Sequence, residues 1–169
     1  SGIPRGAVSV KIPASVQYIE EGAFAYMENL ASINLDSKNK NFVFKDNTLY
    51  TKDKTRIIIY MNSPLKTSYT VPDTVTEIDY GAFDKATSLD KINFGKMDLN
   101  KLNLNQFSET KWYKSLPVNE VLYINDTAVG MAEKYIYAVN VKDGTKKISD
   151  NFASSVWSDA VCIPESVEY

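Results

Sequence analysis

Apolar and polar residues alternate in short runs along this chain, and one such pattern occurs twice. The segment IPASVQYIEEGAF covers residues 12–24, and VPDTVTEIDYGAF covers residues 71–83, 59 positions later. The two segments share apolar positions, a proline and the sequence Gly-Ala-Phe. Self-similarity over tens of residues is the signature of a repeat architecture, so the chain is predicted to consist of stacked repeats.

A second apolar pattern, of the form L-x-x-L-x-L, sets the length of the repeat. Its last positions are Ile12, Leu35, Val71, Phe94, Val141 and Ile163. These are 23, 36, 23, 47 and 22 residues apart, so the short interval is the repeat and the long intervals contain inserts. A repeat of about 20–29 residues with this pattern is typical of leucine-rich repeats. The fold is therefore predicted to be a mostly β solenoid with short turns or 3-10 segments.

Each repeat is predicted to supply one short strand and a return segment. Pro13 follows the first strand and ends it, because proline cannot donate a backbone hydrogen bond to the ladder. Gly22 and Gly81 are expected in tight turns that favour glycine. Phe24 and Phe83 are expected in the core between repeats, because a single repeat cannot bury its apolar face alone.

The later repeats depart from this pattern. The fourth keeps the apolar spacing at Leu99, Leu102 and Phe107 but lacks the proline and the Gly-Ala-Phe sequence. In the fifth, Phe152 stands one position early, which predicts a slipped turn. The sixth stops within the repeat, which leaves an uncapped apolar face. We expect residues 1–169 to be a single leucine-rich-repeat domain, a fragment of a longer repeat protein, that self-associates end to end through this last repeat.

The long intervals hold inserts at residues 38–65 and 110–136. In the first, apolar and β-branched runs flank a polar turn at residues 52–54, which predicts a β-hairpin. The second has similar runs around residues 125–126 and predicts another hairpin. Each hairpin is interpreted either as a decorated edge of the solenoid or as a binding protrusion. Arg56 is placed in a small basic tip on the first hairpin.

The repeated unit I-P-x-x-V-x-x-I-x-x-x-A-F resembles the BspA-like leucine-rich repeat family of bacterial surface proteins. The segments LYTKDKTRIIIYMNSPLKTSYTVPDTV and WYKSLPVNEVLYINDTAV are similar to inserts that recur in that family. The resemblance implies a right-handed solenoid of the β-α superhelix type on a secreted or surface-anchored bacterial protein. It also implies a role in adhesion or protein binding, and no catalytic activity.

Composition removes several function classes. The net charge of −2 gives no electrostatic reason to expect nucleic acid as a partner. No apolar run approaches the roughly 18 residues of a transmembrane segment. The chain has no histidine, which removes the commonest general base and the commonest zinc ligand. The single cysteine, Cys162, excludes an internal disulfide. We predict no catalytic residue, no metal and no cofactor.

A polar stripe is the most site-like feature of the sequence. The residue before the last apolar position of each repeat is predicted to face outward from the sheet. These residues are Lys11, Asn34, Thr70, Asn93, Asn140 and Cys162. In stacked repeats they are expected to form one ladder that binds an extended peptide or a glycan. The alternative is an exposed sheet face that is polar without having a ligand.

The predicted function is therefore non-enzymatic binding or adhesion by a bacterial cell-surface or secreted protein, with a protein or glycan as partner. A structural spacer with no ligand of its own is the alternative. A carbohydrate-active enzyme is the third interpretation, and nothing in the sequence gathers the two carboxylates that glycosidase chemistry needs.

Overall fold

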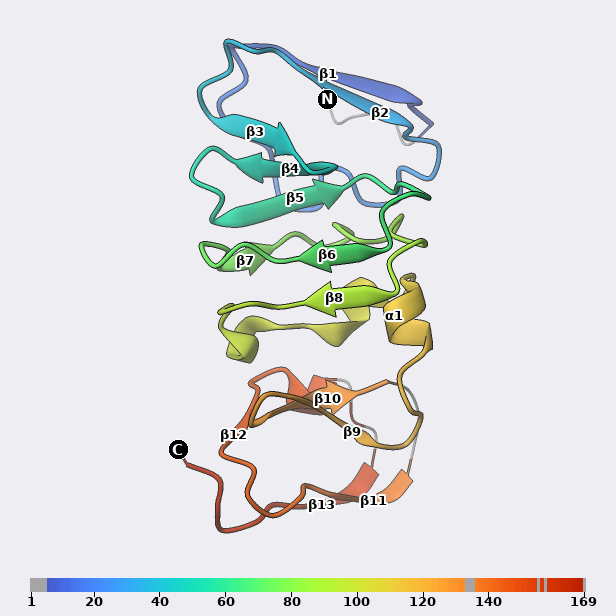
Figure 1. Cartoon of the computed structure of the whole chain (residues 1–169), viewed down its shortest axis with the longest axis vertical. Coiled ribbons are helices and arrows are strands. Elements are labelled where there is room, and N and C mark those ends of the chain that lie inside the picture. Colours follow the sequence, from blue (N-terminus) through green and yellow to red (C-terminus); the bar gives the residue numbers. More distant parts are fainter. Residues whose placement is uncertain (1–5, 133–135, 155, 157, 169) are drawn as a thin grey trace. The chain divides into compact units, whose positions relative to one another are not determined.

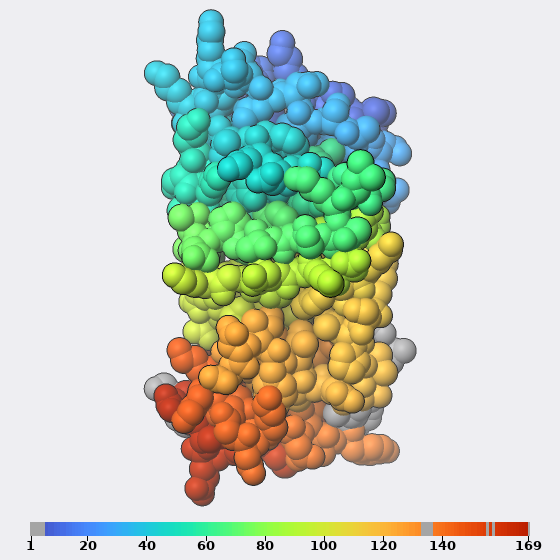
Figure 2. Space-filling model, viewed as in Figure 1, coloured from blue at the N-terminus to red at the C-terminus, as the bar shows by residue number. Residues whose placement is uncertain are grey.

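The computed structural model describes residues 6–132, 136–154, 156 and 158–168 (Figure 1; Figure 2 shows the same view with all atoms drawn as spheres). The chain groups into two compact units, which we call unit 1 (Ser1–Met97 with Glu109–Lys111) and unit 2 (Asp98–Ser108 with Trp112–Tyr169). Both consist of short strands and turns with little helix, so the predicted mostly β leucine-rich-repeat solenoid is confirmed. The single-domain assignment of residues 1–169 stays a prediction.

Unit 1 contains two sheets that each consist of two parallel strands. Its strands are β1 (Ser9–Ile12), β2 (Ser32–Leu35), β3 (Phe42–Lys45), β4 (Thr48–Thr51), β5 (Arg56–Tyr60), β6 (Ser68–Thr70), β7 (Glu77–Ile78) and β8 (Lys91–Asn93). β1 pairs with β2, and β6 pairs with β8. In β1 the side chains of Val10 and Ile12 are buried while Ser9 and Lys11 are exposed. This is the alternation expected of a strand with one covered face.

The first insert is part of the repeat stack of unit 1. β3, β4 and β5 form antiparallel hairpins, and β5 then pairs in parallel with β7. Residues 57–60 of β5 are all buried, as expected of a strand inside a sheet with both faces covered. Figure 1 shows β3, β4 and β5 between β2 and β6. The predicted hairpin is confirmed, but its second strand lies within the stack and does not form a protrusion.

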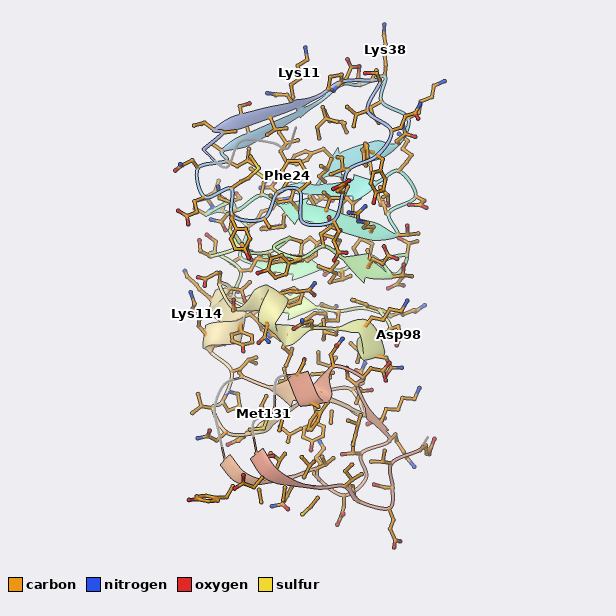
Figure 3. The ribbon with its side chains drawn as sticks, turned by 180° about the vertical axis from the view of Figure 1, so that it is seen from behind. Lys11, Phe24, Lys38, Asp98, Lys114 and Met131 are labelled. Atoms are coloured by element: carbon orange, nitrogen blue, oxygen red, sulfur yellow. The ribbon has the colours of Figure 1, made fainter. Side chains whose placement is uncertain are left out.

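The repeated Gly-Ala-Phe segments form tight turns over the core of unit 1. Gly22 and Gly81 have φ of 69° and 74°, a left-handed conformation that favours glycine. Phe24 and Phe83 follow them and are buried, as predicted. Figure 3 shows Phe24 inside unit 1. A Cβ on Gly81 would lie 2.9 Å from the Cβ of Ala25, so the turns of the first and third repeats touch each other.

Unit 2 repeats the arrangement of strand pair and insert. Its elements are η1 (Leu99–Lys101), η2 (Leu104–Phe107), β9 (Val121–Ile124), β10 (Thr127–Met131), β11 (Ile136–Asn140), β12 (Lys147–Ile148), η3 (Phe152–Ser154) and β13 (Ser158–Cys162). The short helix α1 spans Lys111–Lys114. β9 and β10 form the second predicted hairpin, and β10 pairs in parallel with β12. β11 pairs in parallel with β13. Each insert hairpin therefore ends in a strand that joins the next repeat.

The turn of the fifth repeat differs from the glycine turns of unit 1. Phe152 begins the 3-10 helix η3 and is buried with Met131 and Val139 in the core of unit 2. The position before it is Asn151, which does not have a positive φ. The early phenylalanine is accommodated by this 3-10 turn, in line with the predicted slip.

Arg56 is not part of a basic hairpin tip. Its guanidinium forms a two-point ion pair with the carboxylate of Asp79, with Nη2 2.8 Å from Oδ2. Nη1 of Arg56 also donates to the backbone oxygen of Ile19 at 3.0 Å. The side chain of Asp79 is only 2% exposed. Arg56 therefore joins the insert strand to the repeats on both sides of it.

Candidate binding surfaces

The residues of the predicted polar stripe are all exposed. Lys11, Asn34, Thr70, Asn93 and Asn140 lie on outward positions of their strands, and so does Cys162. Figure 3 shows Lys11 pointing away from unit 1. The strand register pairs them as Lys11 with Asn34, Thr70 with Asn93, and Asn140 with Cys162.

The stripe is not one ladder, so this part of the prediction is wrong. The three pairs belong to three separate two-stranded sheets, β1-β2, β6-β8 and β11-β13. The interruption within unit 1 has a physical cause. The strands β3, β4 and β5 belong to the insert of the second repeat and lie between β2 and β6 (Figure 1), so the outward positions of β2 and β6 are not neighbours.

Two asparagines of the stripe have local hydrogen bonds. The Nδ2 of Asn34 donates to Oγ of Ser9 across the β1-β2 pair at 3.3 Å. The Oδ1 of Asn93 accepts a hydrogen bond from the backbone N of Gly95 at 2.9 Å, which closes the turn after β8. These bonds orient both amides, and Asn93 also contributes to the turn.

A cavity of about 890 Å³ in unit 1 lies beside the first Gly-Ala-Phe turn. Tyr18, Tyr26 and Tyr80 line it and are 71%, 53% and 54% exposed. The hydroxyls of Tyr26 and Tyr80 are 2.7 Å apart, and this hydrogen bond raises the pKa of Tyr80. Gly81 places the two rings together, since its missing side chain lets Ala25 approach. The cavity therefore offers exposed tyrosine side chains to a ligand.

A second cavity of unit 1, of about 440 Å³, lies beside β6, and we call it the β6 groove. Its lining includes Lys45, Tyr50, Lys54, Tyr60, Leu65 and Tyr69. The hydroxyls of Tyr50 and Tyr69 are hydrogen-bonded at 2.7 Å. The hydroxyl of Tyr60 is buried and has no hydrogen-bond partner among the described residues. Burial raises the pKa of Tyr60 and of Tyr69, because the charged phenolate is poorly solvated there.

Sequence reasoning missed this groove. Tyr69 lies on β6, two residues before Val71 in the third repeat, and it is buried. Tyr50 and Tyr60 lie on β4 and β5 of the insert, and no spacing rule brings them next to Tyr69. The chain has eleven tyrosines, but a count does not place side chains.

The described residues contain neither a metal-binding cluster nor a membrane-spanning helix. No group of three or more His, Cys, Asp or Glu side chains is arranged to hold a metal ion in the part of the chain that the structure describes. None of the helices in that part has the length and the hydrophobicity needed to cross a membrane.

Comparison with known structures found similar repeat proteins. A leucine-rich repeat protein from Eubacterium ventriosum is 22% identical over 84% of this chain, which covers 32% of that protein, with a TM-score of 0.46. The pneumococcal vaccine antigen PcpA is 18% identical over 95% of this chain and 28% of its own, with a TM-score of 0.41. The chain thus spans about a third of the length of these proteins. A comparison with curated proteins found no match.

Comparison with protein families is more specific. The sequence matches the BspA type Leucine rich repeat region in six copies, over residues 6–53 and 58–169. The match covers both units, including most of each insert. It agrees with the glycine turns, the parallel strand pairs and the buried phenylalanines of unit 1. The chain belongs to the BspA-type leucine-rich repeat family.

Proposed function

We propose that this chain is a non-enzymatic binding or adhesion module of a bacterial cell-surface or secreted protein. It presents the outward faces of its parallel strand pairs to a protein or glycan partner. Family membership supports the location and the absence of catalysis. The chain spans only part of the length of its structural relatives. The partners of the whole protein are therefore part of the same proposal.

One observation carries the proposal. The outward side chains of the strand pairs are polar and exposed while their neighbours in the same strands are buried, as in β1 and β6. A rigid core therefore holds Lys11, Asn34, Thr70 and Asn93 in fixed positions. Binding costs less entropy when the contacting groups are already ordered.

Arrays of proteins and glycans test the proposal. The labelled chain should bind at least one partner, and the double variant Asn34→Ala with Asn93→Asp should weaken that binding by about tenfold. The aspartate keeps the acceptor that Gly95 uses, so the turn after β8 should survive. Asn29→Ala is the matched control, since Asn29 is exposed and lies outside the strands.

The spacer alternative gives a different result. A structural spacer binds nothing on either array, and that outcome contradicts the proposed function. Binding that the double variant leaves unchanged contradicts the assignment to the strand faces and leaves the binding function itself standing.

A further inference from the structure

The strand β6 has a free edge. Within the described residues it pairs with β8 alone. The backbone O of Thr67 accepts from the N of Lys91, and the N of Val71 donates to the O of Asn93. Alternate residues of a strand direct their backbone groups to the same neighbour. The backbone N–H and C=O of Tyr69 therefore face β8. The backbone N–H and C=O of Ser68 and Thr70 face the opposite edge of β6, and both residues line the β6 groove.

The groove beside this edge has an unsatisfied donor. Tyr60 is 1% exposed, and its hydroxyl has no hydrogen-bond partner among the described residues. Leaving a buried hydroxyl without a partner costs stability, and a ligand that accepts from it would remove that cost. The volume of about 440 Å³ is within the range of pockets that hold ligands.

The rim of the groove is mainly cationic. Lys45, Lys54 and Lys66 line it, together with the single carboxylate of Asp46. Lys66 and Asp46 form an exposed ion pair at 3.4 Å, which is weak because both groups are solvated. Leu65 is 96% exposed at the same rim and offers an apolar contact. The rim is complementary to an acidic ligand with apolar side chains.

The exposure of the tyrosine rings distinguishes two kinds of ligand. A glycan that stacks on aromatic rings needs open ring faces, but Tyr50 and Tyr69 are only 3% and 7% exposed. An extended peptide needs free backbone groups at a strand edge, which β6 has. The observations therefore favour a peptide.

We propose that the β6 groove binds an extended acidic peptide segment of a protein partner, which adds to the free edge of β6 as a further strand. The backbone groups of Ser68 and Thr70 pair with the peptide backbone. Lys45 and Lys66 contact its carboxylates, and the hydroxyl of Tyr60 donates to one of its oxygens. This proposal rests on the proposed binding function and names a site and a partner class for it.

Labelled peptides test the proposal by fluorescence anisotropy. The probe is a peptide of about eight residues that alternates glutamate and valine, and the control replaces each glutamate by lysine. The acidic peptide should bind at least about tenfold more tightly than the basic one, and added salt should weaken it. N-methylation of alternate backbone amides should abolish binding for one of the two alternating sets and be tolerated for the other, since only one edge of the peptide faces β6.

Variants of the protein locate the peptide. Lys45→Glu with Lys66→Glu should weaken the acidic peptide by about tenfold or more. The control is Lys38→Glu, an exposed lysine that points away from unit 1 and does not line the groove (Figure 3). Thr70→Pro should also weaken binding, because it removes an N–H at the free edge and leaves the β6-β8 ladder intact. Tyr60→Phe should weaken binding several-fold while the melting temperature stays the same or rises.

Each contrary outcome overturns the proposal. The first is binding that is equal for the acidic and basic peptides, or equal for the two N-methylated sets. The second is binding of a sulfated polysaccharide that requires the lysines but is unaffected by Thr70→Pro. That result would identify the ligand as an anionic glycan and not a peptide. The third is no binding of acidic peptides to a chain that does bind a partner on the arrays; the proposed function then stands without this site. A chain that binds neither peptides nor array partners contradicts both.

Discussion

In both units the last insert strand pairs in parallel with a strand of the next repeat, but the polar groups at this joint differ. In unit 1, β5 pairs with β7, and Arg56 forms an ion pair with Asp79. In unit 2, β10 pairs with β12, and Thr127 and Ser149 stand at the corresponding positions. Oγ of Ser149 donates to the backbone oxygen of Leu99 at 2.8 Å. A hydroxyl thus replaces a buried salt bridge.

The comparison shows that strand pairing, not the ion pair, defines the joint. The same parallel register forms with and without buried charges. Burying charges costs desolvation energy, so an ion pair in the joint makes it sensitive to the loss of one partner without making it stronger overall. Burial raises the pKa of Asp79, because desolvation disfavours its carboxylate, and the contact with Arg56 acts in the opposite direction.

The turns beside the joints differ in the same way. Unit 1 uses Gly81 in a left-handed conformation next to Ala25. Unit 2 has Asn151 at the corresponding position, and its Nδ2 donates to the backbone oxygen of Asn100 at 3.4 Å. Close backbone packing in one unit is replaced by a side-chain hydrogen bond in the other.

The largest expected effect comes from the core beneath each joint. Phe83→Ala should cost about 3–5 kcal/mol, because the ring is fully buried and removal leaves a cavity. Phe83 also packs against Tyr60 and Tyr69, at ring distances of 5.7 and 5.5 Å. Phe152→Ala should reduce the stability of unit 2 by a similar or smaller amount. Hydrogen exchange of backbone amides in β5 and β10 measures the stability of unit 1 and unit 2, respectively. If one variant reduces protection equally in both units, the division into two compact units is contradicted.

Substitutions of the polar groups at the joint should differ more in their stability cost between the two units. Asp79→Ala leaves Arg56 buried without its partner and should cost about 2–4 kcal/mol, whereas Ser149→Ala should cost about 1 kcal/mol. The paired replacement Arg56→Met with Asp79→Leu should be close to neutral, because it removes both charges together. Urea denaturation of the three variants measures these costs. Equal costs for the two single variants would show that the polar groups are interchangeable.

Substitutions in the turns are expected to have the next largest effect on stability. Gly81→Ala should cost about 2–3 kcal/mol, because the new Cβ meets Ala25 and the φ is left-handed. Gly22→Ala is the control with a similar φ but with its nearest atom at 3.9 Å, and should cost about 1 kcal/mol. Asn151→Ala should cost less than about 1 kcal/mol. Thermal unfolding of the three proteins ranks them, and a Gly22→Ala cost equal to that of Gly81→Ala is inconsistent with close contact between the turns.

The smallest effect is a pH dependence of unit 1. The pKa values of Tyr60 and Tyr69 are raised by burial in the folded chain, so the unfolded chain loses these protons first as the pH rises. The contribution of these two tyrosines to the free energy of unfolding should be constant well below about pH 10 and fall above it. Tyr60→Phe should reduce this fall by up to about 1.4 kcal/mol per pH unit. Urea midpoints of both proteins between about pH 8 and 11 measure the difference, and parallel curves would exclude Tyr60 as a contributor.

Much of the fold was predictable because its signals are local. Alternating apolar residues predicted the strand that ends at Ile12, and the glycine at position 81 predicted a left-handed turn. Both hairpins followed from apolar runs around polar turns. Each of these features depends on residues that are close in sequence, so the pattern of one segment is enough to indicate it.

The candidate sites were less predictable. The outward direction of Asn34 and Asn93 followed from alternation within a strand, and both are exposed. Whether such residues form one ladder depends on which strands are neighbours, and the first insert separates β2 from β6. The β6 groove depends on three tyrosines from three different strands, so no single segment indicates it.

The sequence by itself determined the repeat, its length, its turns and the residues that alternate between core and solvent, because a period of two or a glycine turn is a property of the local backbone. Only the tertiary structure decided that β5 pairs with β7, that Arg56 meets Asp79 and that β6 pairs with β8 alone among the described strands. Those outcomes depend on which distant segment fills the space beside each strand.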